Sequence, residues 1–402
     1  MAKTLSGGFA VLLLVGALTA CGGGGGSAAQ APGQCNNDDP VRVGGIFDIT
    51  GAVAEVSQQQ VRGAELAVQQ LNTGGGVLGR CVKLLVKDAA GDPTKASAAA
   101  RELIDRDEVD TLIGPPNTAT AGASAELSSE SGVLQLVGNT GPIDYQKYPN
   151  VFRMEFAVGQ VGPGFVDIAK ELGRTRIGIL ASNDAFGSSY PDLIRTAAAQ
   201  QGLEIARTEL FDPQTVDLLP QVRAVKDSGA DILVVVATGQ AGVSLFKARQ
   251  ELNWTAPVLA FSGVATPQIQ QAVGPDALRD VYITLNYHDL LRPPGSDAPN
   301  GQKAQEFVTA LKASLNQNPL AENIAYSSTG YDMVMMTAHL AAQANSLELN
   351  ALRNALYAGP FTGVKATYAG SQDSHDLVSS EQLSFARAGT LQDGTLEQVT
   401  AG

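Results

Sequence analysis

The side chains best suited to chemistry in this chain are hydroxyls and amides that follow predicted β-strands, together with glycines. They occur in the segments 114–118, 138–141, 182–184, 237–240 and 262–263, which contain few charged residues. Groups of this kind recognise a ligand through neutral hydrogen bonds and backbone N–H donors. The pattern predicts reversible binding of a small polar solute.

Residues needed for catalysis do not form a recognisable motif. His288, His339 and His375 lie far apart in the sequence, and none belongs to a His-Glu-x-x-His motif or a Cys/His cluster, so a zinc site is not expected. The chain has no Gly-x-Ser-x-Gly nucleophile motif. The glycine-rich segment 74–79 follows a predicted helix, whereas a dinucleotide-binding loop follows a strand. We therefore predict a protein that is not an enzyme and carries no cofactor.

The charge of the chain excludes two classes of partner. Its 402 residues include 40 Asp and Glu against 27 Lys and Arg, which gives a formal net charge of −13. An excess of negative charge repels nucleic acid backbones and anionic lipid surfaces, both of which require basic patches. We predict no binding to nucleic acid, and contact with a membrane only through a covalent lipid anchor.

The N-terminus predicts export. Lys3 precedes an apolar run at 9–15, which is too short to span a bilayer, and Leu-Thr-Ala-Cys follows at 18–21. This tetrapeptide resembles a bacterial lipobox, so residues 1–20 are predicted to be a lipoprotein signal peptide. Cys21 would then be the lipidated N-terminus of a chain that faces the periplasm or the cell exterior. The alternative is a secreted protein cut near Ala20 with Cys21 left free.

Residues 21–39 begin with Cys21 and five glycines and lack large apolar side chains. Such a segment is typical of a flexible tether. Cys35 and Cys81 remain after lipidation, just before the first strand and the second strand respectively. Export permits a disulfide between them, and two unpaired buried thiols are the alternative.

The elements that position the polar segments repeat in two similar series of strands and helices, an alternation typical of α/β proteins. Both series predict doubly wound lobes with parallel sheets. Strands are predicted at 41–47, 82–87, 110–113 and 133–137, then at 176–180, 204–208, 231–236 and 257–261. Helices are predicted at 57–72, 94–106 and 118–130, then at 161–172, 187–201, 217–228 and 240–251. A connection at 286–300, helices at 301–316, 325–344 and 348–358, and strands at 362–368 and 382–387 complete the chain.

Several local motifs occur in a characteristic order. They are Asn-Thr-Gly-Gly-Gly-Val-Leu-Gly-Arg at 72–80, Lys-Asp at 87–88, Asp-Pro at 92–93, Ile-Gly-Pro at 113–115, Asp-Ala-Phe-Gly at 184–187 and Tyr-Asp at 331–332. Over residues 40–385 the chain resembles the type I periplasmic solute-binding proteins of the branched-chain amino acid (leucine/isoleucine/valine-binding) family. The resemblance implies two lobes that close over a solute, which an ABC permease then receives.

The resemblance also implies three crossover strands between the lobes, near 157–161, 284–288 and 359–362. Lobe one would comprise residues 40–158 with 286–360, and lobe two residues 159–285 with 361–390. A ligand-sensing lipoprotein that reports to a membrane sensor is the alternative function, and an enzyme on the same scaffold is a third.

The resemblance assigns candidate ligand contacts one by one. Thr118 matches the hydroxyl residue that binds the ligand carboxylate, although a Thr at a helix start is also a common N-cap. Asn139, Thr140 and Gly141 occupy a loop that adds carboxylate contacts. Phe186 matches an aromatic that stacks on the ligand, with core packing as the alternative role.

The remaining candidates are Tyr326, where an aromatic often lines the pocket, and Gln240 and Ser262 from lobe two. Amino acid binders of this family carry a carboxylate at the position of Ser262, which pairs with the ligand ammonium. Glu155 or Asp184 are possible substitutes for that carboxylate. The missing acid favours a solute with a carboxylate or amide head and an apolar or aromatic body, and a branched-chain or related amino acid is the alternative.

Overall fold

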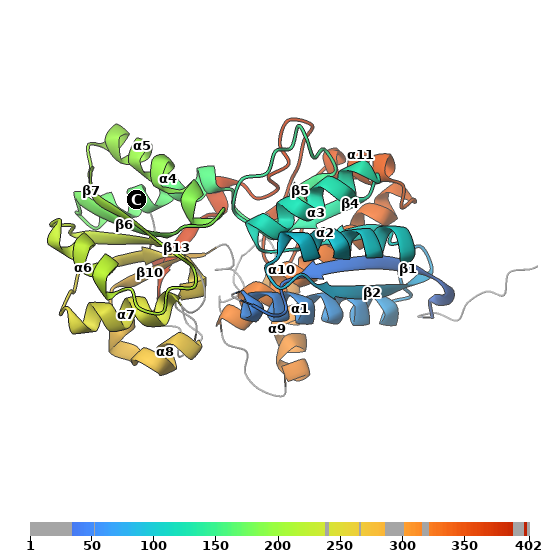
Figure 1. Cartoon of the computed structure of the whole chain (residues 1–402). Helices are drawn as coiled ribbons and strands as arrows, with labels where there is room; N and C mark the ends of the chain where they lie inside the picture. Colours follow the sequence, from blue (N-terminus) through green and yellow to red (C-terminus); the bar gives the residue numbers. More distant parts are fainter. Residues whose placement is uncertain are drawn as a thin grey trace, which may run out of the picture.

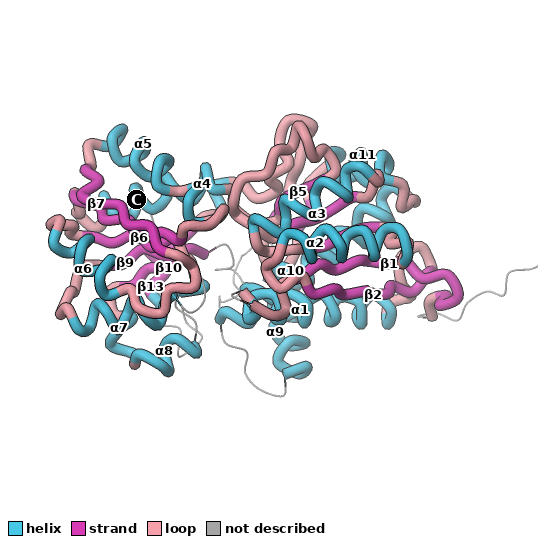
Figure 2. The backbone as a smooth tube through the Cα atoms, viewed as in Figure 1, coloured by secondary structure: helices cyan, strands magenta, loops and turns pink. Residues whose placement is uncertain are grey.

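The computed structural model describes residues 34–51, 53–237, 241–264, 267–285, 301–315, 321–388 and 398–399. Two sheets, each flanked by helices, form two lobes that lie side by side (Figure 1). The tube view shows helices around the strands of each lobe (Figure 2). The predicted α/β fold with two parallel-sheet lobes is therefore confirmed. Cys21 and the residues up to 33 lie outside the described residues. The tether predicted at 21–39 ends earlier than expected, because residues 36–39 belong to the first strand and Cys35 is bonded to Cys81.

Lobe one contains a parallel sheet of five strands in the order β2-β1-β3-β4-β5. Its central strands are short and fully buried because helices cover both faces of the sheet, and such strands consist mainly of aliphatic residues. The strands are β1 Asn36–Phe47, β2 Arg80–Asp88, β3 Thr111–Ile113, β4 Leu134–Val137 and β5 Val151–Arg153.

The helices of lobe one come from two distant parts of the sequence. Helix α1 packs closely against α10, because glycines stand at their contact. A Cβ on Gly63 would lie 1.7 Å from the carbonyl oxygen of Ser327, and one on Gly330 would lie 1.8 Å from that of Gln60. The helices are α1 Ala54–Thr73, α2 Pro93–Arg101 with a π-helical extension Glu102–Arg106, α3 Thr118–Glu130, α9 Gly301–Leu315, α10 Ala321–Ala344 and α11 Leu349–Ala358.

Lobe two contains a sheet of seven strands in the order β14-β13-β10-β9-β8-β6-β7. Strands β6 to β10 are parallel, and β13 and β14 add antiparallel pairs at one edge. The strands are β6 Arg176–Ser182, β7 Glu204–Phe211, β8 Ile232–Val236, β9 Val258–Ala260, β10 Val281–Leu285, β13 Ser384–Arg387 and β14 Gln398–Val399. The helices are α4 Val158–Glu171, α5 Pro191–Gln201, α6 Leu219–Asp227, α7 Ala241–Glu251 and α8 Pro267–Val273.

The first crossover is the segment 154–157 between β5 and α4. The second is expected near 284–288, and residues 286–300 lie outside the described part of the chain. The strand predicted at 362–368 is instead a small hairpin, β11 Phe361–Thr362 and β12 Thr367–Tyr368. Its turn is fixed to lobe one, because the backbone N–H groups of Val364 and Lys365 donate to Asp332 on α10 at 2.8 and 2.9 Å.

The third crossover therefore differs from the one expected near 359–362. After the hairpin the chain runs beside β5, where Arg153 N donates to His375 O at 2.8 Å and Leu377 N donates to Arg153 O at 2.9 Å. The chain joins lobe two only at β13. Residues 361–377, which we expected in lobe two, pack against lobe one because Asp332 and β5 hold them there.

Cys35 and Cys81 are joined in the structure as a disulfide, with their Cα atoms 4.9 Å apart. The bond links the start of β1 to β2, whose pairing begins at Asn36 and Arg80. Among the described residues, no helix has both the length and the apolar character needed to cross a membrane.

Candidate functional site

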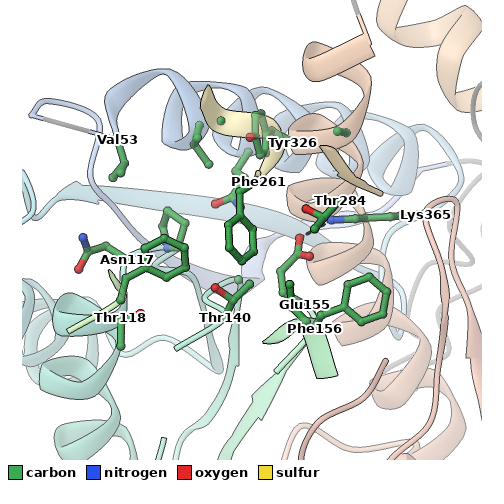
Figure 3. A pocket seen from close by; sticks show the side chains of 18 of the residues that line it. Val53, Asn117, Thr118, Thr140, Glu155, Phe156, Phe261, Thr284, Tyr326 and Lys365 are labelled. Atoms are coloured by element: carbon green, nitrogen blue, oxygen red, sulfur yellow. Dashed lines mark hydrogen bonds and ion pairs between the residues drawn. The ribbon is translucent and has the colours of Figure 1, made fainter. Parts of the chain in front are cut away.

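A cavity of about 140 Å³ lies between the two lobes. Lobe one contributes polar side chains, including Gln60, Thr118 and Thr140, and lobe two contributes Phe186, Phe261 and Thr284. Asn117, Thr118 and Thr140 all line it from lobe one (Figure 3). This is the place where open parallel sheets bind ligands, beyond the carboxyl ends of their strands.

Helix α3 begins at the cavity. Asn117 is its N-cap, and Asn117 Oδ1 accepts hydrogen bonds from the backbone N–H groups of Ala119 at 2.9 Å and Thr120 at 3.3 Å. Thr118 is therefore the first residue of the helix and not its cap, and its side chain lines the cavity. A helix N-terminus attracts anions, since its backbone dipoles place partial positive charge there.

The loop after β4 holds Thr118 in place from the other side. Gly141 fits only because it lacks a side chain, since a Cβ there would lie 2.3 Å from Thr118 Oγ1. The carbonyl of Gly141 accepts hydrogen bonds from Asn139 Nδ2 at 3.0 Å and from Arg153 Nη2 at 2.5 Å. Asn139 and Gly141 thus shape the loop, whereas Thr140 itself lines the cavity.

Aromatic rings form the lobe-two wall. The rings of Phe186 and Phe261 meet edge to face with centroids 5.1 Å apart, and Tyr190 packs against them at 5.4 and 5.3 Å. Tyr190 is fully buried, and burial raises the pKa of its phenol above the ordinary value, so the ring stays neutral. Tyr190 supports the rings of Phe186 and Phe261 from behind, and Tyr326 on α10 and Phe156 also line the cavity.

Two acids and one lysine line the cavity in the described part of the chain. Glu155 forms an ion pair with Lys365, and the two side chains are 14% and 3% exposed. Asp184 is exposed, and its Oδ1 accepts hydrogen bonds from Ser182 Oγ at 3.0 Å and Gly187 N at 2.7 Å. Its contacts stabilise the turn that carries Phe186.

The structure brings together four of the predicted site residues at one cavity: Thr118, Thr140, Phe186 and Tyr326. Ser262 begins a short 3-10 helix, Ser262–Val264, but its side chain is outside the described part, and so is all of Gln240. Sequence reasoning missed the lining residues Gln60, Phe156, Phe261 and Lys365. Only Phe261 carried a usable signal, because it ends a predicted strand.

A metal centre has no support in the described residues. They contain no group of three or more His, Cys, Asp or Glu side chains that could hold a metal ion. His375 is buried among aromatic rings, where it stacks on Phe152 at 4.2 Å, and its Nδ1 lies 2.9 Å from the carbonyl of Val151. His375 therefore packs in the core of lobe one.

Residues 40–390 match the periplasmic binding protein family, and the chain therefore belongs to that family. It is a solute-binding protein and not an enzyme. Among curated relatives, "Leu/Ile/Val-binding protein homolog 3" of Brucella melitensis is 25% identical over 276 residues, which cover 68% of this chain and 72% of the relative.

Solved structures agree in fold at low identity. A leucine-binding protein of Thermotoga maritima is 20% identical with a TM-score of 0.77, and the match covers 90% of this chain and 98% of that one. A solute-binding protein of an ABC transporter from Rhodopseudomonas palustris, in complex with 3,4-dihydroxybenzoic acid, is 21% identical with a TM-score of 0.74 over 87% and 93% of the two chains. The fold is thus that of the type I periplasmic binding proteins.

Proposed function

We propose that this chain is the solute receptor of an ABC importer. It binds a small solute with a carboxylate or amide head and an apolar or aromatic body, and delivers it to a membrane permease. The observation that carries this proposal is a cavity between two lobes with hydroxyls and a helix N-terminus on one side and aromatic rings on the other. Its volume of about 140 Å³ is close to the roughly 150 Å³ of an engineered cavity that takes up benzene.

The head of the solute is assigned to the lobe-one side. Thr118 and Thr140 supply hydroxyl donors there, and the start of α3 supplies a favourable potential for an anion. The apolar body then lies against Phe186 and Phe261. Each lobe contributes contacts, so the bound solute stabilises the closed arrangement of the two lobes.

The lack of a dedicated acid favours an acid or amide over an α-amino acid. The sequence has Ser262 where amino acid binders present a carboxylate. The charge of Glu155 is paired with that of Lys365. Asp184 accepts hydrogen bonds from Ser182 and Gly187 within its own turn. A buried ammonium without a carboxylate partner would lose a charge-assisted hydrogen bond worth about 1.5–3 kcal/mol.

A covalent lipid on Cys21 would hold the receptor at the membrane, and the residues between Cys21 and the disulfide at Cys35 would let it reach the permease. Stable anchoring through Cys21 requires more than one acyl chain on that residue, since a single acyl chain binds a membrane only marginally. The lobes then remain outside the cytoplasm and capture solute there.

A thermal-shift and calorimetry panel tests the ligand class. We expect benzoate, benzamide or 4-methylpentanoate to raise the melting temperature, because a ligand at a hundred times its Kd adds about 2.7 kcal/mol of stability. Thr118→Ala should weaken binding, whereas Thr73→Ala, at the exposed end of α1, should not. Binding of leucine without binding of 4-methylpentanoate would contradict the proposed ligand class, and no binding across the panel would contradict the proposed function.

A further inference from the structure

A buried ion pair lies in the wall of the solute cavity. Glu155 comes from the first crossover, and Lys365 comes from the turn between β11 and β12. Lys365 Nζ also donates to Thr329 Oγ1 at 2.6 Å, and Thr329 Oγ1 donates to Glu155 Oε1 at 2.9 Å. Three segments that are distant in sequence therefore meet at this point of the cavity.

The position of Lys365 is fixed by its backbone. Its N–H donates to the buried carboxylate of Asp332 at 2.9 Å, so the backbone of Lys365 is held to α10 beside the cavity. A buried ion pair contributes little net stability compared with apolar side chains of the same size, because both charges lose their hydration. Stability alone therefore gives no reason for a charged pair at the cavity wall.

The pair lies on the opposite side of the cavity from Asn117 and Thr118, at the start of α3 (Figure 3). Figure 3 shows Asn117 and Thr118 on one side, Glu155 and Lys365 on the other, and the ring of Phe261 between them. A solute whose carboxylate contacts Thr118 and whose body lies along Phe261 therefore directs its far end toward the ion pair.

The hydrogen-bonding capacity of the pair indicates what that far end is. An ammonium group has three N–H donors, and the described residues receive two of those of Lys365, at Glu155 and Thr329. The neighbouring carboxylate is an acceptor with about four lone-pair sites. A hydroxyl both donates and accepts, so it can bond to either member of the pair. A second charge on the solute would instead be repelled by one of them.

We propose that the Glu155–Lys365 pair recognises a hydroxyl group at the far end of the solute. The ligand is then a hydroxy acid or hydroxy amide rather than a plain acid. This inference rests on the proposed function, because it takes the carboxylate or amide head to lie at Thr118 and Thr140.

Two pairs of probes that differ by one hydroxyl test the inference: benzoate with 4-hydroxybenzoate, and pentanoate with 5-hydroxypentanoate. Calorimetry on the wild-type protein should show the hydroxylated member of at least one pair binding about tenfold to a hundredfold more tightly, the range for hydrogen bonds to charged groups. In the double variant Glu155→Met/Lys365→Met, which removes both charges and both hydrogen-bonding groups together, the two members of that pair should bind equally.

Lys303→Met is the matched control. Lys303 Nζ donates to Thr362 O at 2.9 Å on the same hairpin, but Lys303 does not line the cavity, so the preference for the hydroxylated probe should persist. The single variant Glu155→Gln is a second test, because it removes the negative charge while its amide oxygen can still accept from Lys365 and Thr329. This variant should bind benzene-1,4-dicarboxylate at least tenfold more tightly than the wild type does.

The outcomes separate the two proposals. Equal wild-type affinity for the hydroxylated and plain members of both pairs would overturn the role of the ion pair and leave the receptor function standing. A hydroxyl preference that survives in the double variant would also overturn it. If the wild-type protein binds none of the four acids, nor benzamide, the proposed function fails and this inference fails with it.

Discussion

Gly141→Ala provides a direct test of how the head-group site is built. The added Cβ would lie 2.3 Å from Thr118 Oγ1, 2.5 Å from its Cγ2 and 2.9 Å from its Cβ. Contacts between such atoms are normally about 3.5 Å or longer, so the gap must open by about 1 Å. Neither side yields easily, because Asn139 and Arg153 hold the Gly141 carbonyl, and Asn117 caps the first turn that contains Thr118.

We expect Gly141→Ala to lower the free energy of unfolding by about 1–3 kcal/mol, the usual cost of overpacking. Thr118 must also turn away from the cavity, so affinity for a carboxylate solute should fall by a further 1–3 kcal/mol if its hydroxyl bonds to a buried ligand oxygen. Urea unfolding followed by circular dichroism measures the first effect, and calorimetry with the acid that binds the wild type measures the second.

The control is Gly122→Ala in α3, the helix that begins at Thr118, where an added Cβ meets nothing within 4 Å. It should stabilise the protein by up to about 1 kcal/mol, because alanine favours the helix over glycine. Thr118→Ala removes two of the three clashing atoms, so the double variant Thr118→Ala/Gly141→Ala should recover stability with a coupling of about 1 kcal/mol or more. A Gly141→Ala protein as stable as the wild type, or additive effects in the double variant, would refute the reasoning.

Three further predictions concern the N-terminus, the disulfide and a buried acid. A fatty-acid analogue should label the wild-type protein expressed in a lipoprotein-processing host, and persistent label on Cys21→Ser would contradict lipidation. Thiol titration of the unfolded, unreduced protein should find neither Cys35 nor Cys81 reactive, and reduction should remove about 4 kcal/mol of stability by the loop-entropy estimate. Burial raises the pKa of Asp332 from 3.8 to about 6, so the folded state binds its proton more tightly than the unfolded state. The free energy of unfolding of the wild type relative to Asp332→Asn should therefore fall by about 2 kcal/mol as pH rises from 3.8 to 6. An unchanged difference between the two proteins in urea titrations across that pH range would contradict the shift.

The lobe-one side of the site could be predicted from local sequence patterns. Strands β3 and β4 are adjacent and parallel, with Ile113 opposite Leu136, so the segments that follow them meet at one edge of the sheet. Thr118 and Thr140 lie in those segments, and both line the cavity. Their proximity follows from two short aliphatic runs and the rule that ligands bind beyond strand ends.

The Glu155–Lys365 pair could not be predicted in this way. Its members are 210 positions apart, and neither follows a strand in a recognisable motif. Their contact depends on the buried Asp332, which accepts two backbone N–H groups of the hairpin turn. Gly363 permits this close approach, since a Cβ there would lie 2.3 Å from Asp332 Oδ2. The sequence pattern at 362–368 indicates a single strand and does not reveal that acceptor.

The same anchoring determines where the chain passes from lobe one to lobe two. Residues 375–377 pair with β5, and Asp376 forms an ion pair with Arg153 at 3.1 Å, so the chain stays with lobe one up to that point. Gln160 Nε2, at the start of α4, then donates to Val378 O at 2.8 Å. The first and third crossovers therefore run side by side, and a rotation of the lobes must bend 154–157 and 378–383 together.

Glu155 lies within the first of these two segments and also lines the solute cavity. Rotation of the lobes changes the backbone dihedral angles of a hinge segment, and at this position that rotation would move one member of the ion pair while Asp332 holds the other to α10. A solute that bonds to both Glu155 and Lys365 would favour the one arrangement in which they are in contact. A ligand shifts a conformational equilibrium only by its difference in affinity for the two states. In this protein, contact with the ion pair is one physical source of that difference, because it depends on both the solute and the hinge angle.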